Sequence, residues 1–250
     1  SLFVGSSDVY KRQVEGRVGL LIDGLPLGWL LPGTLSQFFK TPQDKSQGWM
    51  AASALMVLRY LCMLITLFLP AVYIAAVTFH LEMLPTELAL SIIAAKQDVP
   101  FTTVFEVLLM LVAFEIIQEA GLRLPSSIGQ TVSILGGLVV GSAAVEARIV
   151  SPAVLIVVAV AGIAGYTMPS QDFAGALRIW RFGLAALASL AGMFGAAIGA
   201  LLLICHLASL ESFGVAYLTP FAANDGEQVE GHAVIRQPLP SVKLREAALK

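Results

Sequence analysis

Charged residues are scarce in this chain. Asp, Glu, Lys and Arg make up 13% of its 250 residues, whereas hydrophobic residues make up 57%. Ordinary globular domains contain about 25% charged residues, so this composition lies well outside their usual range. It is typical of a protein embedded in a lipid bilayer.

Basic patches and cysteine frameworks are also lacking. The formal net charge is −2 at pH 7, and no basic patch is present, so nucleic acid is not expected as a partner. Cys62 and Cys205 lie in separate apolar stretches, where a thiol behaves as a small buried hydrophobe. The sequence therefore predicts no disulfide framework, no metal site and no cofactor.

Motifs of the common enzyme classes are absent as well. The chain contains no Walker loop, no dinucleotide-binding glycine fingerprint, no zinc-protease helix motif and no Gly-x-Ser-x-Gly elbow. No nucleophile and base set is recognisable without them. We predict that the protein is not an enzyme.

What the chain does contain is long apolar windows. A bilayer core about 30 Å thick requires about 20 apolar residues of helix. Four windows contain no Asp, Glu, Lys or Arg: Tyr60–Phe79, Ser126–Val145, Ile149–Gln171 and Phe182–Cys205. A fifth segment, Pro100–Gln118, has a similar length but contains Glu106 and Glu115. These windows predict an all-α integral membrane protein, a polytopic helical bundle with about five transmembrane helices.

Two further apolar segments are not suited to a straight span. Val18–Phe39 contains Pro26 and Pro32, and proline blocks continuation of a helix, so a strand or turn followed by a short interfacial helix is expected. Pro85–Lys96 is too short to cross a bilayer and is expected to be interfacial or re-entrant.

Orientation follows from the positions of Lys and Arg. Lys40, Lys45 and Arg59 place the region before the first span in the cytoplasm. Five spans then put the C-terminal tail outside, although the tail carries several basic residues. Either the basic residues of the tail do not determine its side of the membrane, or one of the five segments is re-entrant.

Three regions are expected along the chain. Residues 1–15 are predicted to be non-native, because Asp8–Gln13 back-translates readily to a sequencing-library adapter. Residues 16–223 form the predicted membrane domain. Residues 224–250 are abruptly polar and are predicted to form a soluble C-terminal tail.

Carboxylates at membrane depth are the main candidates for function. Glu106 and Glu115 are nine residues apart, which places them about 180° apart on a regular helix. They cannot line the same lumen unless the helix is broken or oligomeric contacts use both faces. Glu106 is open to two interpretations, a hydrogen bond to a neighbouring helix or a place in an ion or proton path. Glu119 and Arg123 are four residues apart and are expected to form an interfacial salt bridge.

Small residues recur at helical spacing in two of the windows. Gly137 and Gly141, and likewise Gly195 and Gly199, are four residues apart, a spacing that lets helix backbones approach closely in lipid. Helix packing is the expected role, and a pore-lining or hinge role is the alternative.

Several short motifs occur in a fixed order. They are Asp23-Gly24-Leu25-Pro26, Pro70-Ala71-Val72-Tyr73, Glu119-Ala120-Gly121-Leu122-Arg123-Leu124-Pro125, Val145-Glu146-Ala147-Arg148 and Ser212-Phe213-Gly214. In this order they resemble the A subunit of GerA-type spore germination receptors, over about Gly16 to Ala223. Asp23, Gly24, Pro26, Gly121 and Pro125 are the motif residues of this resemblance. The stage V sporulation paralogue of the family is similar over the same region.

The resemblance implies a subunit of a spore germinant receptor in the inner membrane of bacterial endospores. It implies partnership with a transporter-like B subunit and a lipoprotein C subunit, and a homo-oligomer that forms a nutrient-gated ion channel. It also implies a soluble domain upstream of this region. Glu106, Glu115, Glu119 and Arg123 are then candidate pore or gating residues, because carboxylates favour cation passage.

Two other functions fit the sequence. An intramembrane carboxylate could exchange protons in a secondary transporter. Alternatively, the chain could be a structural membrane scaffold for its partner subunits, with the carboxylates only bridging helices.

Overall fold

The chain forms two compact units, which we describe separately. A computed structural model describes residues 18–21, 28–31, 33–41, 44, 47–122, 136–137, 139–219 and 221. One unit combines Ser1–Leu61 with Leu203–Lys250, and the other is Cys62–Leu202. The predicted non-native segment and the predicted polar tail lie outside the described residues.

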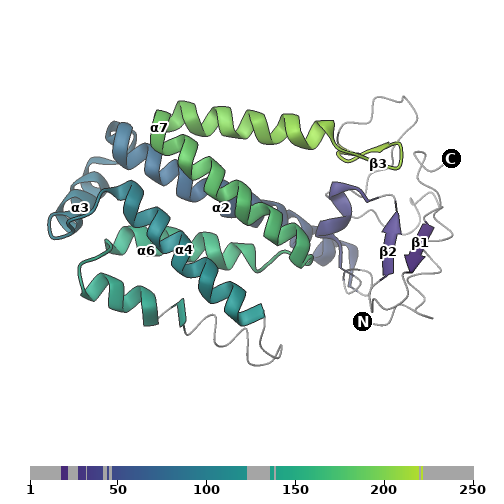
Figure 1. The fold of residues 1–250 in the computed structure, drawn as a ribbon, viewed down its shortest axis with the longest axis horizontal. Coiled ribbons are helices and arrows are strands. Elements are labelled where there is room, and N and C mark those ends of the chain that lie inside the picture. Colours follow the sequence, from purple (N-terminus) through teal and green to yellow (C-terminus); the bar gives the residue numbers. More distant parts are fainter. Residues whose placement is uncertain are drawn as a thin grey trace. The chain divides into compact units, whose positions relative to one another are not determined.

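Helices dominate the described part of the chain. They are α2 (Trp49–Phe79), η3 (Leu81–Met83), α3 (Thr86–Lys96), α4 (Thr103–Leu122), α6 (Pro152–Gly165) and α7 (Gln171–Ser209). Residues 136–137 and 139–146 are also helical. Within Cys62–Leu202, α4 packs against α6, as Figure 1 shows. The predicted helical class is confirmed.

Among the described residues, two helices have the length and composition to cross a membrane. These are α2 and the Asp172–Ser209 part of α7. α2 contains the whole of the predicted Tyr60–Phe79 window, whereas α6 has only 14 residues within the predicted Ile149–Gln171 window. Ser126–Val145 lies partly outside the described residues. The count of about five spans therefore stays a prediction.

α7 differs most from expectation, because it folds back on itself. Ala191 and Gly192 have non-helical dihedral angles, and Gly192 has φ 61° and ψ −139°. Residues without a Cβ tolerate positive φ most readily, so glycine suits the bend. Figure 1 shows the two arms that result. The predicted window Phe182–Cys205 is thus divided at Gly192 and is not one straight span.

Glycines after the bend bring the two arms of α7 together. A Cβ at Gly199 would lie 2.6 Å from Leu184 Cδ2, and one at Gly195 would overlap the carbonyl group of Leu187. Leu184 and Leu187 both belong to the arm before the bend. The close approach of the arms therefore depends on the missing side chains.

Substitution at Gly195 is expected to destabilise the helical unit. Because the added Cβ of Gly195→Ala would meet backbone, we expect a loss of about 1–3 kcal/mol in the free energy of unfolding. Gly183→Ala is the matched control, since nothing lies within 4 Å of a Cβ there and alanine favours helix by about 1 kcal/mol. Thermal unfolding in detergent measures both. Equal melting temperatures for the two variants would contradict the folded-back arrangement.

Two short hairpins and a 3₁₀ helix characterise the other unit. β1 (Val18–Leu21) pairs antiparallel with β2 (Gly28–Leu31), and η1 (Leu35–Phe39) follows. β3 (Glu211–Ser212) pairs with β4 (Val215–Ala216). The Leu35 N–H donates to the carbonyl of Tyr217 at 2.8 Å, which ties the two parts of this unit. A strand followed by a short helix is the arrangement expected for Val18–Phe39.

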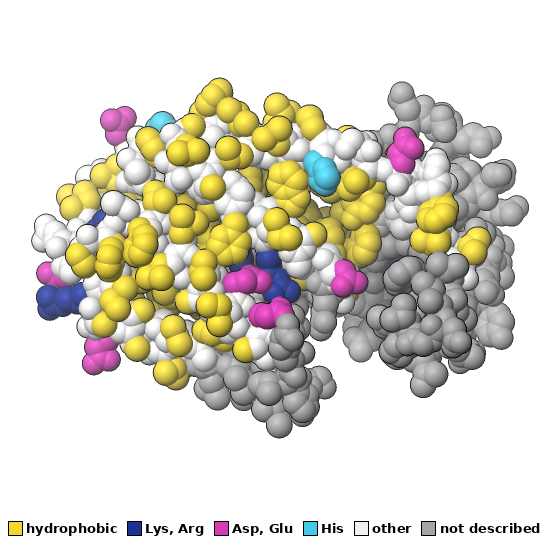
Figure 2. All heavy atoms as spheres, viewed as in Figure 1, with side chains coloured by type: hydrophobic (Ala, Val, Ile, Leu, Met, Phe, Trp, Pro, Cys, Tyr) yellow, Lys and Arg dark blue, Asp and Glu magenta, His cyan; other side chains and the backbone are white. Residues whose placement is uncertain are grey.

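Polar and apolar side chains are distributed unusually in Cys62–Leu202. Ile116, Ile179 and Leu190 are 65%, 75% and 78% exposed, whereas Glu106 and Arg181 are 0% and 1% exposed. Figure 2 shows hydrophobic side chains over much of the visible face. Soluble proteins rarely expose contiguous apolar surface of this kind. The distribution suits a lipid environment.

Candidate functional site

Glu106 lies in the first turn of α4 and contacts the beginning of α6. Its Oε2 accepts a hydrogen bond of 2.9 Å from the backbone N–H of Ser151, the residue that precedes α6. The first N–H groups of a helix have no partner within the helix, and its N-terminus carries partial positive charge. The Glu106 carboxylate therefore satisfies a backbone donor and stabilises the start of α6.

A third element, α3, reaches the same carboxylate. Lys96, the last residue of α3, places its Nζ 3.7 Å from Glu106 Oε1 and also donates to the Thr103 hydroxyl. Glu106 Oε1 has no hydrogen-bond partner among the described residues. The carboxylate thus joins α3, α4 and α6.

Glu115, further along α4, connects that helix to the first arm of α7. Its Oε1 lies 2.6 Å from Arg178 Nη1, and its Oε2 lies 3.3 Å from Arg181 Nη2. The Arg181 guanidinium is also 5.9 Å from the ring centroid of Phe182. Removing one partner of such a buried pair leaves the other charge uncompensated. This α4–α7 ion-pair cluster, Glu115 with Arg178 and Arg181, is the main polar link between the two helices.

The structure describes some of the remaining predicted site residues but not others. Glu119 is exposed near the end of α4, and Gly121 is buried as the next-to-last residue of that helix. Several predicted residues lie outside the described part of the chain: Asp23, Gly24, Pro26, Arg123 and Pro125. The predicted Glu119–Arg123 salt bridge therefore stays a prediction. A pore or gating role for these residues also stays a prediction.

Gly137 and Gly141 lie against neighbouring helices. A Cβ at Gly137 would be 3.2 Å from the Phe114 ring of α4, and one at Gly141 would be 2.5 Å from Leu155 of α6. Both distances are tighter than ordinary side-chain contacts. A side chain at either position would displace these neighbours.

The partners of Glu115 were not predicted from the sequence. Arg178 and Arg181 are 63 and 66 residues away, so no local spacing relates them to the carboxylate. A signal was nevertheless present. Two arginines three residues apart at the start of a long apolar helix face the same side of that helix, and such charges require an acidic partner.

A second missed ion pair lies in the unit that contains Ser1–Leu61. Arg59 Nη1 is 2.6 Å from Asp44 Oδ2, and Arg59 Nη2 is 2.9 Å from Asp44 Oδ1, a bidentate geometry. Arg59 also donates to the carbonyl of Phe39, and Phe39 stacks on Tyr60 at 4.0 Å between ring centroids. The pair therefore fixes the segment before α2 against the N-terminal third of that helix.

The pKa of Asp44 lies below its ordinary value of 3.8. Burial raises this pKa, but hydrogen bonds from Arg59 and from the Thr41 backbone outweigh burial. A lowered pKa means that the contribution to stability is present above pH 3.8 and is lost as pH falls through the folded-state pKa.

Asp44→Asn is expected to lower stability at neutral pH by about 1.5–3 kcal/mol, the usual contribution of a charged hydrogen bond. The difference from the unmodified protein should shrink as the pH falls below 3.8. Asp98→Asn is the control, because Asp98 pairs with Arg148 on the exposed surface and such pairs contribute about 0–1 kcal/mol. Melting temperatures across pH test this. A deficit for Asp44→Asn that persisted at the lowest pH would exclude the titration of Asp44 as its cause.

Metal chemistry has no support in the described residues. No group of three or more His, Cys, Asp or Glu side chains that could hold a metal ion occurs there. Glu106 and Glu115 instead form contacts between helices. Their arrangement can hold helices together, and it can change if an ion or ligand competes for the same groups.

Comparison with known proteins places these observations in a family. The family model described as Bacillus/Clostridium GerA spore germination protein matches residues 8–248. No solved structure matches the chain.

Individual relatives agree with the family match. Spore germination protein B1 of Bacillus subtilis is 43% identical over 237 residues, which are 95% of this chain and 49% of that protein. Spore germination protein KA of the same organism is 43% identical over 230 residues, 92% of this chain and 42% of that protein. The membrane protein YfkQ of B. subtilis is 40% identical over 222 residues, 89% of this chain and 43% of that protein. The chain thus spans about half the length of these relatives, and it belongs to the GerA family of spore germination proteins.

Proposed function

We propose that this chain is the membrane-embedded part of a spore germinant receptor A subunit, located in the inner membrane of endospores. Its partners are a transporter-like B subunit, a lipoprotein C subunit and further copies of itself. Together they form an ion channel that opens in response to a nutrient and starts germination. The GerA relatives and the exposed apolar surface of Cys62–Leu202 support this proposal.

The observation that carries the channel proposal is the α4–α7 ion-pair cluster. Glu115, Arg178 and Arg181 are paired in this structure, so the Glu115 carboxylate is already engaged and does not offer a free cation site. Ionic contacts between helices are switchable, because each helix can exchange one charged partner for another. The cluster is therefore proposed as a lock that holds α4 and the first arm of α7 together until a nutrient signal arrives.

Five transmembrane segments remain part of the proposal, with one change. The division of α7 at Gly192 gives two arms where the sequence predicted one span. Each arm is apolar after its first turns, so either or both can lie within the bilayer. If α7 enters and leaves the bilayer on the same side, the C-terminal tail emerges on the side opposite to the one that a single α7 span would give.

The receptor role can be tested in spores. In an endospore-forming host, the full-length gene is deleted, and nutrient-triggered release of K⁺ and loss of refractility are followed. Deletion should abolish the response to one nutrient class while lysozyme-induced outgrowth remains. Unchanged responses to all nutrients would argue against a germinant receptor and would favour the stage V sporulation paralogue.

A structural scaffold is the second candidate, and one observation favours it. Glu106 is fully buried, holds the start of α6 and pairs with the end of α3, which is the behaviour of a residue that builds an interface between helices. If partner subunits assemble on this chain yet no ion flux follows, the scaffold replaces the channel. A secondary transporter would instead show saturable, pH-driven uptake by this polypeptide alone.

A further inference from the structure

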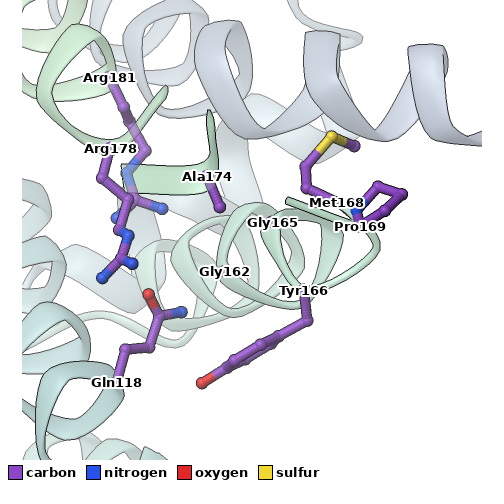
Figure 3. A pocket seen from close by; sticks show the side chains of 9 residues that line it. All are labelled: Gln118, Gly162, Gly165, Tyr166, Met168, Pro169, Ala174, Arg178 and Arg181. Carbon is purple, nitrogen blue, oxygen red and sulfur yellow. The ribbon is translucent and has the colours of Figure 1, made fainter. Parts of the chain in front are cut away.

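A cavity of about 190 Å³ lies between α4, α6 and the first arm of α7. Figure 3 shows that Arg178 and Arg181 enter it from α7 and Gln118 from α4, with Tyr166 just beyond the end of α6. Met168 and Pro169 form an apolar wall on another side. All of these residues belong to Cys62–Leu202.

The polar lining of the cavity consists mainly of donors. Two guanidinium groups line it, and the one carboxylate that pairs with both, Glu115, is not among the lining residues. Arg181 is 1% exposed, and its Nε has no hydrogen-bond partner among the described residues. The Gln118 amide and the Tyr166 hydroxyl can supply further donors. An unpaired buried donor of this kind favours an acceptor of negative charge.

The size of the cavity restricts the ligand. Pockets for drug-sized ligands have volumes of about 300–1,000 Å³, whereas this cavity has about 190 Å³. A group of that size is a carboxylate or phosphate with a few attached carbons. Guanidinium groups recognise both through parallel hydrogen bonds to two oxygens.

We propose that this cavity binds one small oxyanion, a carboxylate or a phosphodiester, through Arg178 and Arg181. Gln118 and Tyr166 donate to its remaining oxygens, and the Met168–Pro169 wall contacts its carbon atoms. The oxyanion comes either from the headgroup of an acidic phospholipid or from a small soluble acid.

Occupancy of the cavity has a consequence for the lock. The oxyanion shares both arginines with Glu115, so it weakens the attraction between α4 and α7. This coupling rests on the proposed channel function, whereas binding itself does not. A binding measurement therefore tests the site separately from the channel.

The test uses the full-length protein in a neutral detergent. The probes are inorganic phosphate, acetate and phosphatidylglycerol, with chloride at matched ionic strength and phosphatidylcholine as references. At least one probe should raise the melting temperature in a saturable manner beyond its reference. Phosphate or acetate binding would identify a soluble source, and phosphatidylglycerol alone would identify a lipid. No saturable shift with any probe would overturn the proposal.

Variants of the cavity lining distinguish binding in the cavity from general effects of anions on the melting temperature. Ala174→Leu fills the cavity without removing a charge and should abolish the shift, whereas Ala176→Leu, exposed on the same helix, should retain it. Tyr166→Phe removes one donor from a half-exposed position and should weaken binding about five-fold, which keeps the proposal testable if Ala174→Leu does not fold. An unchanged shift in a folded Ala174→Leu variant, or in Tyr166→Phe, would overturn it.

Discussion

A receptor that carries Glu115→Gln is expected to release K⁺ without a nutrient and to be less stable than the unmodified receptor. The substitution leaves Arg178 and the buried Arg181 without their shared carboxylate. Breaking a buried pair on one side costs about 3–5 kcal/mol, and because the Glu115 side chain is 29% exposed we expect a value of about 3 kcal/mol. Apparent melting temperature and the basal K⁺ leak of reconstituted receptor measure the two effects.

A second substitution shows whether the loss of stability comes from the uncompensated arginine or from the missing carboxylate itself. Arg181→Met added to Glu115→Gln removes the uncompensated buried cation and should recover part of the stability. Glu87→Gln is the control, because it makes the same chemical change at an exposed position in the first turn of α3. The Glu115→Gln receptor could instead be stable and show no basal K⁺ leak, but conduct less in response to nutrient. That result would indicate that Glu115 lines the pore.

Glu106→Leu is expected to have the largest effect on folding. It leaves the Ser151 N–H without its acceptor and Lys96 without its partner, so the cost is about 3–5 kcal/mol. Glu106→Gln should cost about 1 kcal/mol, since the amide oxygen can still accept from Ser151 while the attraction to Lys96 and to the helix N-terminus is lost. Folded yield in membranes and thermal unfolding in detergent measure this ranking.

The Gln and Leu variants at Glu106 also distinguish capping from ion passage. If the carboxylate acts only through helix contacts, Glu106→Gln should retain nutrient-driven flux, and Lys96→Met should partly rescue Glu106→Leu. If Glu106→Gln folds normally but abolishes flux, the carboxylate serves ion or proton passage. Equal destabilisation by Gln and Leu would contradict the hydrogen bond to Ser151.

Much of the fold could be predicted because apolar windows reflect the solvent rather than long-range contacts. The Tyr60–Phe79 window falls wholly within α2, and the prolines of Val18–Phe39 correctly excluded a long helix there. Such features are decided locally, by the absence of charge or by the missing proline N–H.

The bend of α7 could not be predicted from the same signals. Gly192, Gly195 and Gly199 are equally consistent with close packing between separate helices and with a hairpin. Only the positive φ of Gly192 and the approach of Gly195 to Leu187 decide between them. Those are tertiary facts, since glycine alone permits the bend but does not require it.

Only the acidic residues of the candidate site could be predicted from the sequence. Glu106 and Glu115 stand out because carboxylates are rare within apolar segments, and helical spacing assigns them to opposite faces. Their partners Ser151, Arg178 and Lys96 come from other elements, and no spacing rule connects residues across separate helices. The partners decide whether a carboxylate is a free ion site or part of an interhelical contact.

Ion flux through the reconstituted receptor tests the central claim most directly. The full-length protein is incorporated into liposomes with its B and C partners, and K⁺ release is recorded with and without candidate nutrients, for the unmodified protein and for Glu115→Gln. We expect tight liposomes until nutrient is added and constitutive release from the variant. Verified assembly of both receptors, with no K⁺ release from either under any condition, would contradict a gated channel held shut by the α4–α7 ion-pair cluster.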